Sequence, residues 1–553
     1  MSRLSPRSSR QFPRLAAHPR APASSRQSWQ SAISRRFRLA AGQIRGFACN
    51  GKTPPRLRPS RYGDCNSVVA KNVGNRRFSS TSQYGTVGAR RDWPPTRGDP
   101  EQPMRDLLIL LVVFASVAAT LRYPFVGILA WAWFTLMTPN QLGYGAFGVP
   151  LNLVIAAATM GSIVINGGLK NFRADPVTLA LVLFAGWLTI SQWFSLDADQ
   201  SAQYYDRFIK TIVFILLAIQ MTTTRLRAHA LLWMLVISVG YFGAKGGLFT
   251  LATLGQYRVQ GIEDTVLADN NHLGIAMATM LPLVAYLREQ SARAIVRRGL
   301  EGLFVLMLIA VIGTQSRGAF ISLVVFAAFY WLYSKHKLAI IAAFVAIATP
   351  TLFMMPSKWF DRMATIGTAT EDESFMGRVN AWRINFRFAQ ENPVTGAGLR
   401  VPYDADMVRT IEPGLAEGAK AAHSIYFEML GGTGFVGLLI FLTTLAVAIL
   451  TAMATARRDK GANPDVATWK GRFAYYAQIS LITFCVGGAS VSLEMWDGYW
   501  IVIALIAAAA RAPAEGAAES RAKGQQRAPY AGETFRRARL ADRKRVLPPV
   551  VDA

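Results

Sequence analysis

Residues 299–334 read GLEGLFVLMLIAVIGTQSRGAFISLVVFAAFYWLYS, two apolar runs joined by the short polar turn TQSRG at 314–318. Runs of this length and composition are typical of helices that cross a membrane. Outward from this pair, apolar runs alternate with polar segments from residue 106 to residue 512. The pattern predicts an all-α polytopic membrane protein, embedded in a lipid bilayer.

Thirteen apolar runs are expected to be helices. They fall near residues 106–121, 124–137, 150–166, 177–195, 207–222, 228–254, 271–288, 299–314, 318–334, 338–355, 425–452, 472–491 and 498–512. Only Arg122-Tyr123-Pro124 separates the first two. We therefore prefer about twelve membrane crossings, with the first pair acting as one broken element, over thirteen.

The net charge of +27 over 553 residues would suggest nucleic-acid binding in a soluble protein. Residues 1–103, however, hold 18 Arg and 2 Lys against four acids, which accounts for +16 of that charge. The remainder is ordinary for a membrane protein with basic cytoplasmic loops. We expect no nucleic-acid partner.

Residues 1–103 are rich in Arg, Ser and Pro and lack apolar periodicity, so we expect a disordered basic extension there. Met104-Arg105-Asp106, followed at once by LLILLVVF, has the form of a natural start. An upstream start assigned in error is favoured over a genuine basic tail, and both over an organellar transit peptide. Residues 513–553 are expected to form a basic cytoplasmic tail.

Basic residues recur in alternate loops, for example at Arg225 and Arg227 and again at Arg457 and Arg458. The positive-inside rule makes those loops cytoplasmic. The polar loop 356–424 then faces outward, on the same side as the TQSRG turn. We expect the active site on this outer side, where the unusual polar residues gather.

Arg317 lies in the TQSRG turn, beside the membrane surface. It could anchor its helix by reaching the headgroups. Alternatively, its guanidinium group clamps a phosphate through two parallel hydrogen bonds. Gly318 beside it is expected to let a bulky headgroup approach the backbone.

The stretch MGRVNAWRINFRFAQENP (376–393) predicts an amphipathic helix that ends at Asn392-Pro393. Its apolar face is expected to comprise Val379, Trp382 and Phe386. The helix could lie on the membrane surface, or it could line the site. In the second case Arg378, beside the open Gly377, is the second clamp, and Arg383 is a further substrate contact.

His423 comes just before the apolar run that begins at Ile425. A histidine in this position is commonly an interfacial hydrogen-bonding group, but its ordinary pKa also suits a general base near neutral pH. Glu428, five residues later, is a second candidate for the base and is expected to contact the substrate. The glycines that follow, from Gly431 to Gly437, permit close contacts with the helix.

Four further residues are expected to bind substrate: Arg258, Asn270, Asn271 and Lys245. Lys245 lies inside an apolar run, where a charge is costly enough to indicate function, although it could also extend to the interface. The chain has no GxxxxGK[ST], HExxH or CxxC motif. We therefore expect no metal and no cofactor, and an activated donor that already resides in the membrane.

Four segments in this order resemble the O-antigen ligase and polymerase superfamily of bacterial inner-membrane glycosyltransferases. They are TQSRGAF (314–320), GRVNAW (377–382), NPVTGAGL (392–399) and AHSIYFEMLGGTGFVG (422–437). YFGAKGGLFTL (241–251) and residues 256–277 resemble, more narrowly, the O-glycosylation ligases associated with the exosortase A system. The resemblance divides the chain into an N-terminal membrane region, 104–290, and a catalytic membrane region, 291–512.

The resemblance implies transfer of a glycan from an undecaprenyl-diphosphate carrier to a hydroxyl of a protein or lipid acceptor, on the periplasmic side of the inner membrane. It implies a metal-independent, inverting reaction in which His423 removes the acceptor proton. Arg317 and Arg378 would stabilise the leaving diphosphate. Ser424 stands where many relatives have asparagine.

Two alternatives to a ligase are open. A polymerase of lipid-linked repeat units would use the same motifs, and only segments 241–251 and 256–277 favour the ligase. A transporter or flippase should show internal repeats and charges in both leaflets, and the sequence shows neither pattern.

Overall fold

The computed structural model describes residues 102–141, 151–168, 173–333, 336–364, 373–462 and 468–512, all within the compact unit Tyr84–Ala553. Within these residues the secondary structure is helical, with no β-strand. The predictions for residues 1–101 and 513–553 lie outside the described residues.

The helices before the TQSRG turn are α2 (Gln102–Arg122), α3 (Pro124–Met137), α4 (Leu151–Ile165), α5 (Pro176–Trp193), α6 (Ala198–Met221), α7 (Arg225–Ala252), α8 (Asn270–Gln290) and α9 (Ala294–Gly313). Those after it are α10 (Arg317–Tyr333), α11 (Lys337–Phe353), α12 (Ser357–Ala364), α13 (Glu373–Glu391), α14 (Ala405–Ile411), α15 (Ile425–Ala462), α16 (Trp469–Gly488) and α17 (Asp497–Arg511). Short 3-10 turns include η3 (Val401–Tyr403) and η4 (Pro413–Gly418).

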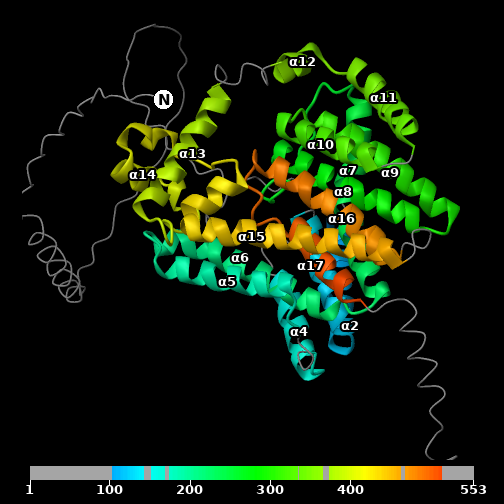
Figure 1. Cartoon of the computed structure of the whole chain (residues 1–553), viewed down its shortest axis with the longest axis horizontal. Coiled ribbons are helices and arrows are strands. Elements are labelled where there is room, and N and C mark those ends of the chain that lie inside the picture. The colour runs from blue at the N-terminus through cyan, green and yellow to red at the C-terminus, as the bar shows by residue number, and fades with distance from the viewer. Residues whose placement is uncertain are drawn as a thin grey trace, which may run out of the picture. The chain divides into compact units, whose positions relative to one another are not determined.

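Each of the thirteen predicted apolar runs is a helix, namely α2 to α11 and α15 to α17 (Figure 1). The start of α6 was predicted too late, at residue 207 rather than Ala198. The Asp197 side chain accepts a hydrogen bond from the Gln200 backbone amide and so caps a polar first turn. Residues 198–206, which precede the predicted start, are therefore helical.

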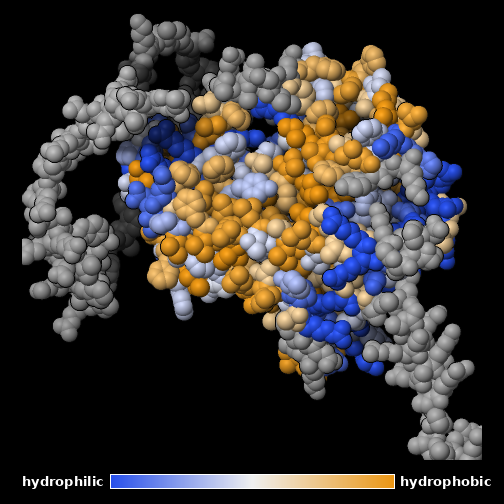
Figure 2. Space-filling view, in the orientation of Figure 1, coloured by the Kyte–Doolittle hydropathy of each residue, from blue (hydrophilic) through white to orange (hydrophobic). Residues whose placement is uncertain are grey.

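Three of the described helices are long and apolar enough to cross a membrane: Pro176–Trp193, Arg225–Ala252 and Ile425–Asp459. Large apolar side chains on their outer faces, such as Leu179, Leu439 and Leu450, are more than 60% exposed. Figure 2 shows hydrophobic residues over the middle of α15 and hydrophilic residues towards α14 and around the far end of α15. The chain is thus an all-helical membrane protein, but the structure does not show the predicted twelve crossings.

Two helices form the centre of the bundle. Almost every residue of α8 is buried, because α8 packs against α9, α10 and α16, and α17 is buried between α6, α7, α15 and α16. A helix that is apolar on all sides must be surrounded by other helices or by lipid. The packing of α8 brings its first turn, Asp269 to His272, to the TQSRG turn at the start of α10.

Residues 373–422, here called the loop subdomain, are more ordered than the predicted polar loop. Helix α13 packs against α15, and a small separate core contains Ile384, Phe388, Val401 and Val408. The buried side of α13 runs through Ala381, Ile384 and Phe388 rather than the predicted face, and Phe386 is 41% exposed. Ile384 and Phe388 are buried in the core of the subdomain itself, whereas Trp382 and Phe386 of the predicted face contact Phe427 and Phe435 of α15.

The loop subdomain is hydrogen-bonded to α15 at a break in that helix. Gly434 has φ 74° and ψ −177°, so the carbonyl groups just before it lose their partners within the helix. The turn at 392–399 replaces them: Ala397 N donates to Gly431 O at 2.9 Å, and Gly398 N donates to Gly432 O at 3.0 Å. Phe435 N donates in return to Pro393 O at 2.9 Å. The glycines predicted to permit close packing do so here.

Candidate functional site

His423 lies in the connection between η4 and α15, with a left-handed backbone conformation, φ 49°. Non-glycine residues seldom adopt this conformation, and strained residues often cluster at functional sites. The backbone amide of His423 donates to Ser492 Oγ at 3.1 Å. Its ring Nδ1 is buried and has no hydrogen-bond partner among the described residues. The backbone of His423 is thus fixed by a hydrogen bond, while Nδ1 of its ring has no partner among the described residues.

Glu428 holds the segment around His423. Its Oε1 accepts hydrogen bonds from Ala422 N at 2.8 Å, from Ser492 Oγ at 2.6 Å and from Tyr403 Oη at 2.6 Å. Ser492 thus joins Glu428 to the His423 amide. The structure places Glu428, predicted as a substrate contact or a second base, in the support of the His423 loop.

Beneath this loop lies a buried ion pair that the sequence analysis missed. Arg400 Nη2 donates to Glu494 Oε1 at 2.9 Å, and Arg400 Nη1 donates to Tyr403 Oη at 2.5 Å. Burial raises the pKa of Glu494 to about 7, although the charge of Arg400 opposes this shift. The pair connects the loop subdomain to the segment between α16 and α17.

Other charged groups converge on the His423 ring. Burial, then the charge of Arg378 on α13, then that of His272 on α8, lowers the pKa of His423 to about 4. Asp269, the N-cap of α8, acts in the opposite direction. Arg378 therefore lies near enough to His423 for its charge to lower the pKa of the ring.

Helix α13 is fixed to the His423 loop by Trp382. Its Nε1 donates to Ala422 O at 2.7 Å, and its ring stacks on Phe427 with centroids 5.2 Å apart. Gly377, expected to leave open space beside Arg378, instead faces the Lys420 amino group, with which a Cβ would collide. A second cationic group, the amino group of Lys420, thus lies beside Gly377.

The TQSRG turn reaches the same region from the other side. Asn270 Nδ2 donates to Thr314 O at 2.8 Å, and Gln315 has a left-handed φ of 54°. Arg317, the first residue of α10, is half-buried. A Cβ on Gly318 would collide with Ser490 Oγ, so this glycine allows contact with the α16–α17 segment rather than approach of a headgroup. That segment also carries Ser492, so it links the turn to His423.

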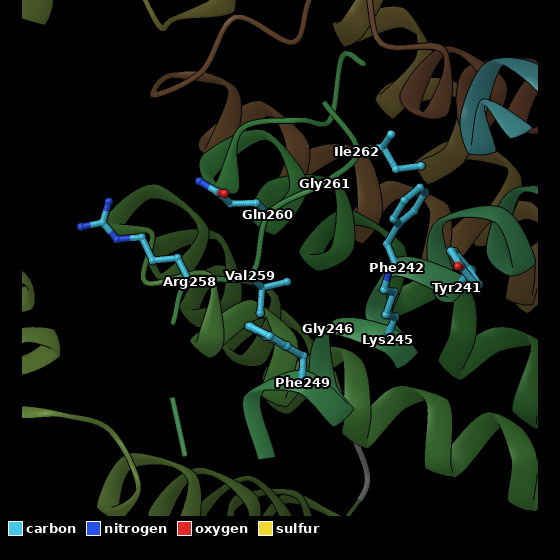
Figure 3. Close-up of a pocket in the computed structure, with 10 residues that line it drawn as sticks. All are labelled: Tyr241, Phe242, Lys245, Gly246, Phe249, Arg258, Val259, Gln260, Gly261 and Ile262. Atoms are coloured by element: carbon cyan, nitrogen blue, oxygen red, sulfur yellow. The ribbon is translucent and has the colours of Figure 1, made fainter. Parts of the chain in front are cut away.

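Lys245 and Arg258 line one cavity of about 270 Å³ beside the turn. Figure 3 shows Lys245 on α7, facing the extended segment that carries Val259 and Gln260, while the guanidinium group of Arg258 extends away from Lys245. Arg258 Nε donates to Gln315 Oε1 at 3.4 Å. The cavity is thus connected to the TQSRG turn through Arg258.

Of the two remaining predicted substrate contacts, Arg383 lies away from the site and Asn271 adjoins Asn270 at the start of α8. Arg383 pairs with Glu412 at 3.1 Å on the exposed side of the loop subdomain, so it does not converge on His423. The backbone amide of Asn271 donates to Asp269 Oδ1 in the cap of α8, and its side chain is half-buried.

Of the site residues that the sequence analysis did not predict, Glu494 could have been recognised from its sequence context. It stands in SLEMWDGYW between two apolar runs, where an acid must find a partner on burial. Arg400 could not have been recognised in this way, because its partner Glu494 lies 94 residues away in the sequence and comes close only in the folded protein.

Two regions of the chain match known families. Residues 302–442, which include Arg317, Arg378 and His423, match the O-antigen ligase family. The chain therefore carries an O-antigen ligase domain. Residues 104–292 match a family of unknown function. No curated protein matches the chain.

The O-antigen ligase domain identifies a membrane enzyme of the glycan ligase or polymerase type, which uses a lipid-linked glycan donor. The two matched regions meet at the site: Asn270 bonds Thr314, Arg258 bonds Gln315, and Val259 N donates to Gly313 O at 3.0 Å. The region of unknown function thus contributes directly to the surroundings of the O-antigen ligase motifs.

Proposed function

We propose that this protein is a glycan ligase that transfers a finished glycan from an undecaprenyl-diphosphate carrier to an acceptor hydroxyl, in particular of an exported protein, on the periplasmic face of a bacterial inner membrane. The observation that carries the proposal is the buried His423 inside the O-antigen ligase domain, whose ring Nδ1 has no hydrogen-bond partner among the described residues and whose pKa the charge of Arg378 lowers. This arrangement supplies a base next to a fixed cation.

In the proposed reaction, the acceptor oxygen attacks the anomeric carbon and forms the new glycosidic bond. The bond from that carbon to the carrier phosphate breaks, and the diphosphate leaves with the electron pair. His423 takes the proton of the acceptor hydroxyl. Arg317 and Arg378 stabilise the charge that grows on the diphosphate. A single displacement inverts the anomeric centre, and the two arginines take the place of a divalent metal ion.

The low pKa of His423 also has a role in this proposal. A base with a pKa of about 4 accepts a proton weakly. A bound diphosphate would neutralise Arg378, whose charge is the second largest cause of the lowered pKa. Donor binding would therefore raise the basicity of His423 when the acceptor is to be deprotonated.

Several residues outside the O-antigen ligase domain lie beside its TQSRG turn. Asn270, Arg258 and Lys245 come from the region of unknown function and surround the TQSRG turn or its cavity. We propose that Lys245, Arg258, Asn270 and Asn271 help to hold the donor. Arg383, which faces Glu412, is left out of this set.

The test compares lipid-linked and transferred glycans in source cells that carry the wild-type gene, a deletion, or His423→Ala at the same membrane abundance. A ligase predicts that both mutants accumulate full-length glycan on the lipid carrier while the acceptors lose theirs. Single repeat units on the carrier would identify a polymerase instead. Normal transfer by His423→Ala would exclude His423 as the base.

A matched control is Arg383→Gln, which alters an arginine on the same subdomain but outside the site. It should transfer glycan as the wild type does. A defect as large as that of His423→Ala would indicate that any change in the loop subdomain disrupts the enzyme.

A further inference from the structure

A second cavity, of about 410 Å³, lies at the other end of α5 from the loop subdomain. Ser195, just after the end of α5, contacts the loop subdomain through a hydrogen bond to Ala397 O. The start of α5 lies beside the second cavity, and its 18 residues span about 27 Å. That length is close to the thickness of the hydrocarbon core. The cavity therefore lies at the headgroup level of the opposite leaflet.

Three arginines line this cavity: Arg173, Arg227 and Arg511. They come from the start of α5, the first turn of α7 and the end of α17. Asp175 pairs with Arg511, so two of the three positive charges have no acidic partner among the described residues. The cavity is thus cationic, and its lining also includes the apolar residues Ile219 and Met221.

Two of the arginines, Arg227 and Arg511, are oriented by contacts that leave donors unused. Arg227 Nη1 donates to Met221 O at 2.8 Å, and its guanidinium group lies over the Phe125 ring at 5.3 Å. Arg511 contacts Asp175, Thr178 and Gln220 through its terminal nitrogens, while its Nε is buried without a partner. A guanidinium fixed in this way loses little entropy when it binds an anion.

Thr222 supplies an independent indication of a ligand. It lines the cavity and is only 5% exposed, yet its Oγ1 makes no hydrogen bond within the described part of the chain. A buried hydroxyl group without a partner costs free energy, so such groups normally find one. An oxygen-rich anion in the cavity would accept from Thr222 as well as from the arginines.

We propose that this pocket binds a phosphate-bearing anion, and its position favours the headgroup of an anionic phospholipid in the leaflet opposite to the His423 site. Arginine recognises phosphate oxygens through paired hydrogen bonds. Basic pockets between membrane helices commonly hold anionic headgroups. The bound lipid would join the ends of α5, α6, α7 and α17.

The test uses native mass spectrometry and thermal unfolding of the purified full-length protein in detergent, titrated with phosphatidylglycerol, phosphatidylcholine or inorganic phosphate. The wild type should retain phosphatidylglycerol in preference to phosphatidylcholine. The double variant Arg173→Gln/Arg227→Gln should bind it at least about tenfold more weakly, because charge-assisted hydrogen bonds are lost. Thr222→Val, which keeps every charge, should weaken binding by about fivefold.

The control Arg293→Gln/Arg297→Gln removes the same charge from exposed arginines outside the cavity and should bind the lipid as the wild type does. Equal retention by the wild type and the Arg173→Gln/Arg227→Gln variant overturns the proposal, and so does an equal loss in the control. If the double variant does not purify as a folded protein, Thr222→Val decides. Protection by inorganic phosphate as strong as that by phosphatidylglycerol would keep the site but replace the lipid by a small anion.

Discussion

The two faces of the loop subdomain place the same ion-pair chemistry in opposite surroundings. On the inner face, Arg400 and Glu494 pair at 2.9 Å with side chains 8% and 1% exposed. On the outer face, Arg383 and Glu412 pair at 3.1 Å with side chains 57% and 22% exposed. Water screens the second pair but not the first. Whether an arginine of the loop subdomain contributes to stability thus depends on whether it faces the helix bundle or water.

The largest expected effect is on stability. Arg400→Gln leaves Glu494 buried without its counter-charge, which should cost about 3–5 kcal/mol, whereas Arg383→Gln should cost about 0–1 kcal/mol. Thermal unfolding of the purified protein in detergent measures the difference. A double variant, Arg400→Met/Glu494→Leu, should recover much of the loss because no unpaired charge is left behind. Equal unfolding temperatures for Arg400→Gln and Arg383→Gln would remove the distinction between the faces.

Activity should separate the arginines of α13 itself. Arg378→Gln removes a cation beside His423 and should lower the transfer rate by about 10²–10³-fold, as the loss of one transition-state donor does. Arg383→Gln should change the rate by less than about twofold, because an exposed ion pair contributes little. Transfer from a lipid-linked donor by purified enzyme gives both values. Similar losses in the two variants would show that α13 acts through its total charge.

The attachment of the inner face to the bundle should depend on Gly434. A Cβ there would collide with Val394 O at a φ of 74°, so Gly434→Ala should destabilise the protein by about 1–3 kcal/mol. Gly186→Ala is the control, because Gly186 lies in α5 with open space around it. That substitution should be neutral or stabilising by up to about 1 kcal/mol. An equal fall in the unfolding temperatures of Gly434→Ala and Gly186→Ala would contradict the proposed role of the break in α15.

The difference between the faces also shows what the sequence could reveal. Apolar runs predicted all thirteen helices of the bundle because burial in lipid or protein requires long apolar segments. The most buried side of α13 was predicted wrongly, since Ile384 and Phe388 are covered by Val401 and Val408, which follow in the polar segment after α13. Periodicity alone cannot tell a face that meets a helix from one that meets lipid.

For the site, too, the sequence predicted some residues but not their surroundings. The motif residues Arg378 and His423 were predicted from the sequence, and in the structure the charge of Arg378 lowers the pKa of His423. Gly318 and Gly377 were read as open space, but Ser490 and Lys420 occupy it. A glycine in the sequence does not say whether the space beside it is open, as at Gly186, or occupied, as at Gly318.

The smallest expected effect is a shift along the pH axis. The pKa of His423 lies at about 4, below its ordinary value, so the neutral base form prevails from neutral pH down towards pH 4. The kcat/KM of transfer, which reports the free enzyme, should therefore stay level well below pH 6.5 and fall only as His423 becomes protonated. Arg378→Gln removes a positive charge that lowers this pKa, so the acid limb of its residual activity should move to higher pH. Arg383→Gln should leave the limb in place, because its charge pairs with Glu412. A wild-type limb near pH 6.5, or identical limbs in all three proteins, would show that Arg378 does not tune His423.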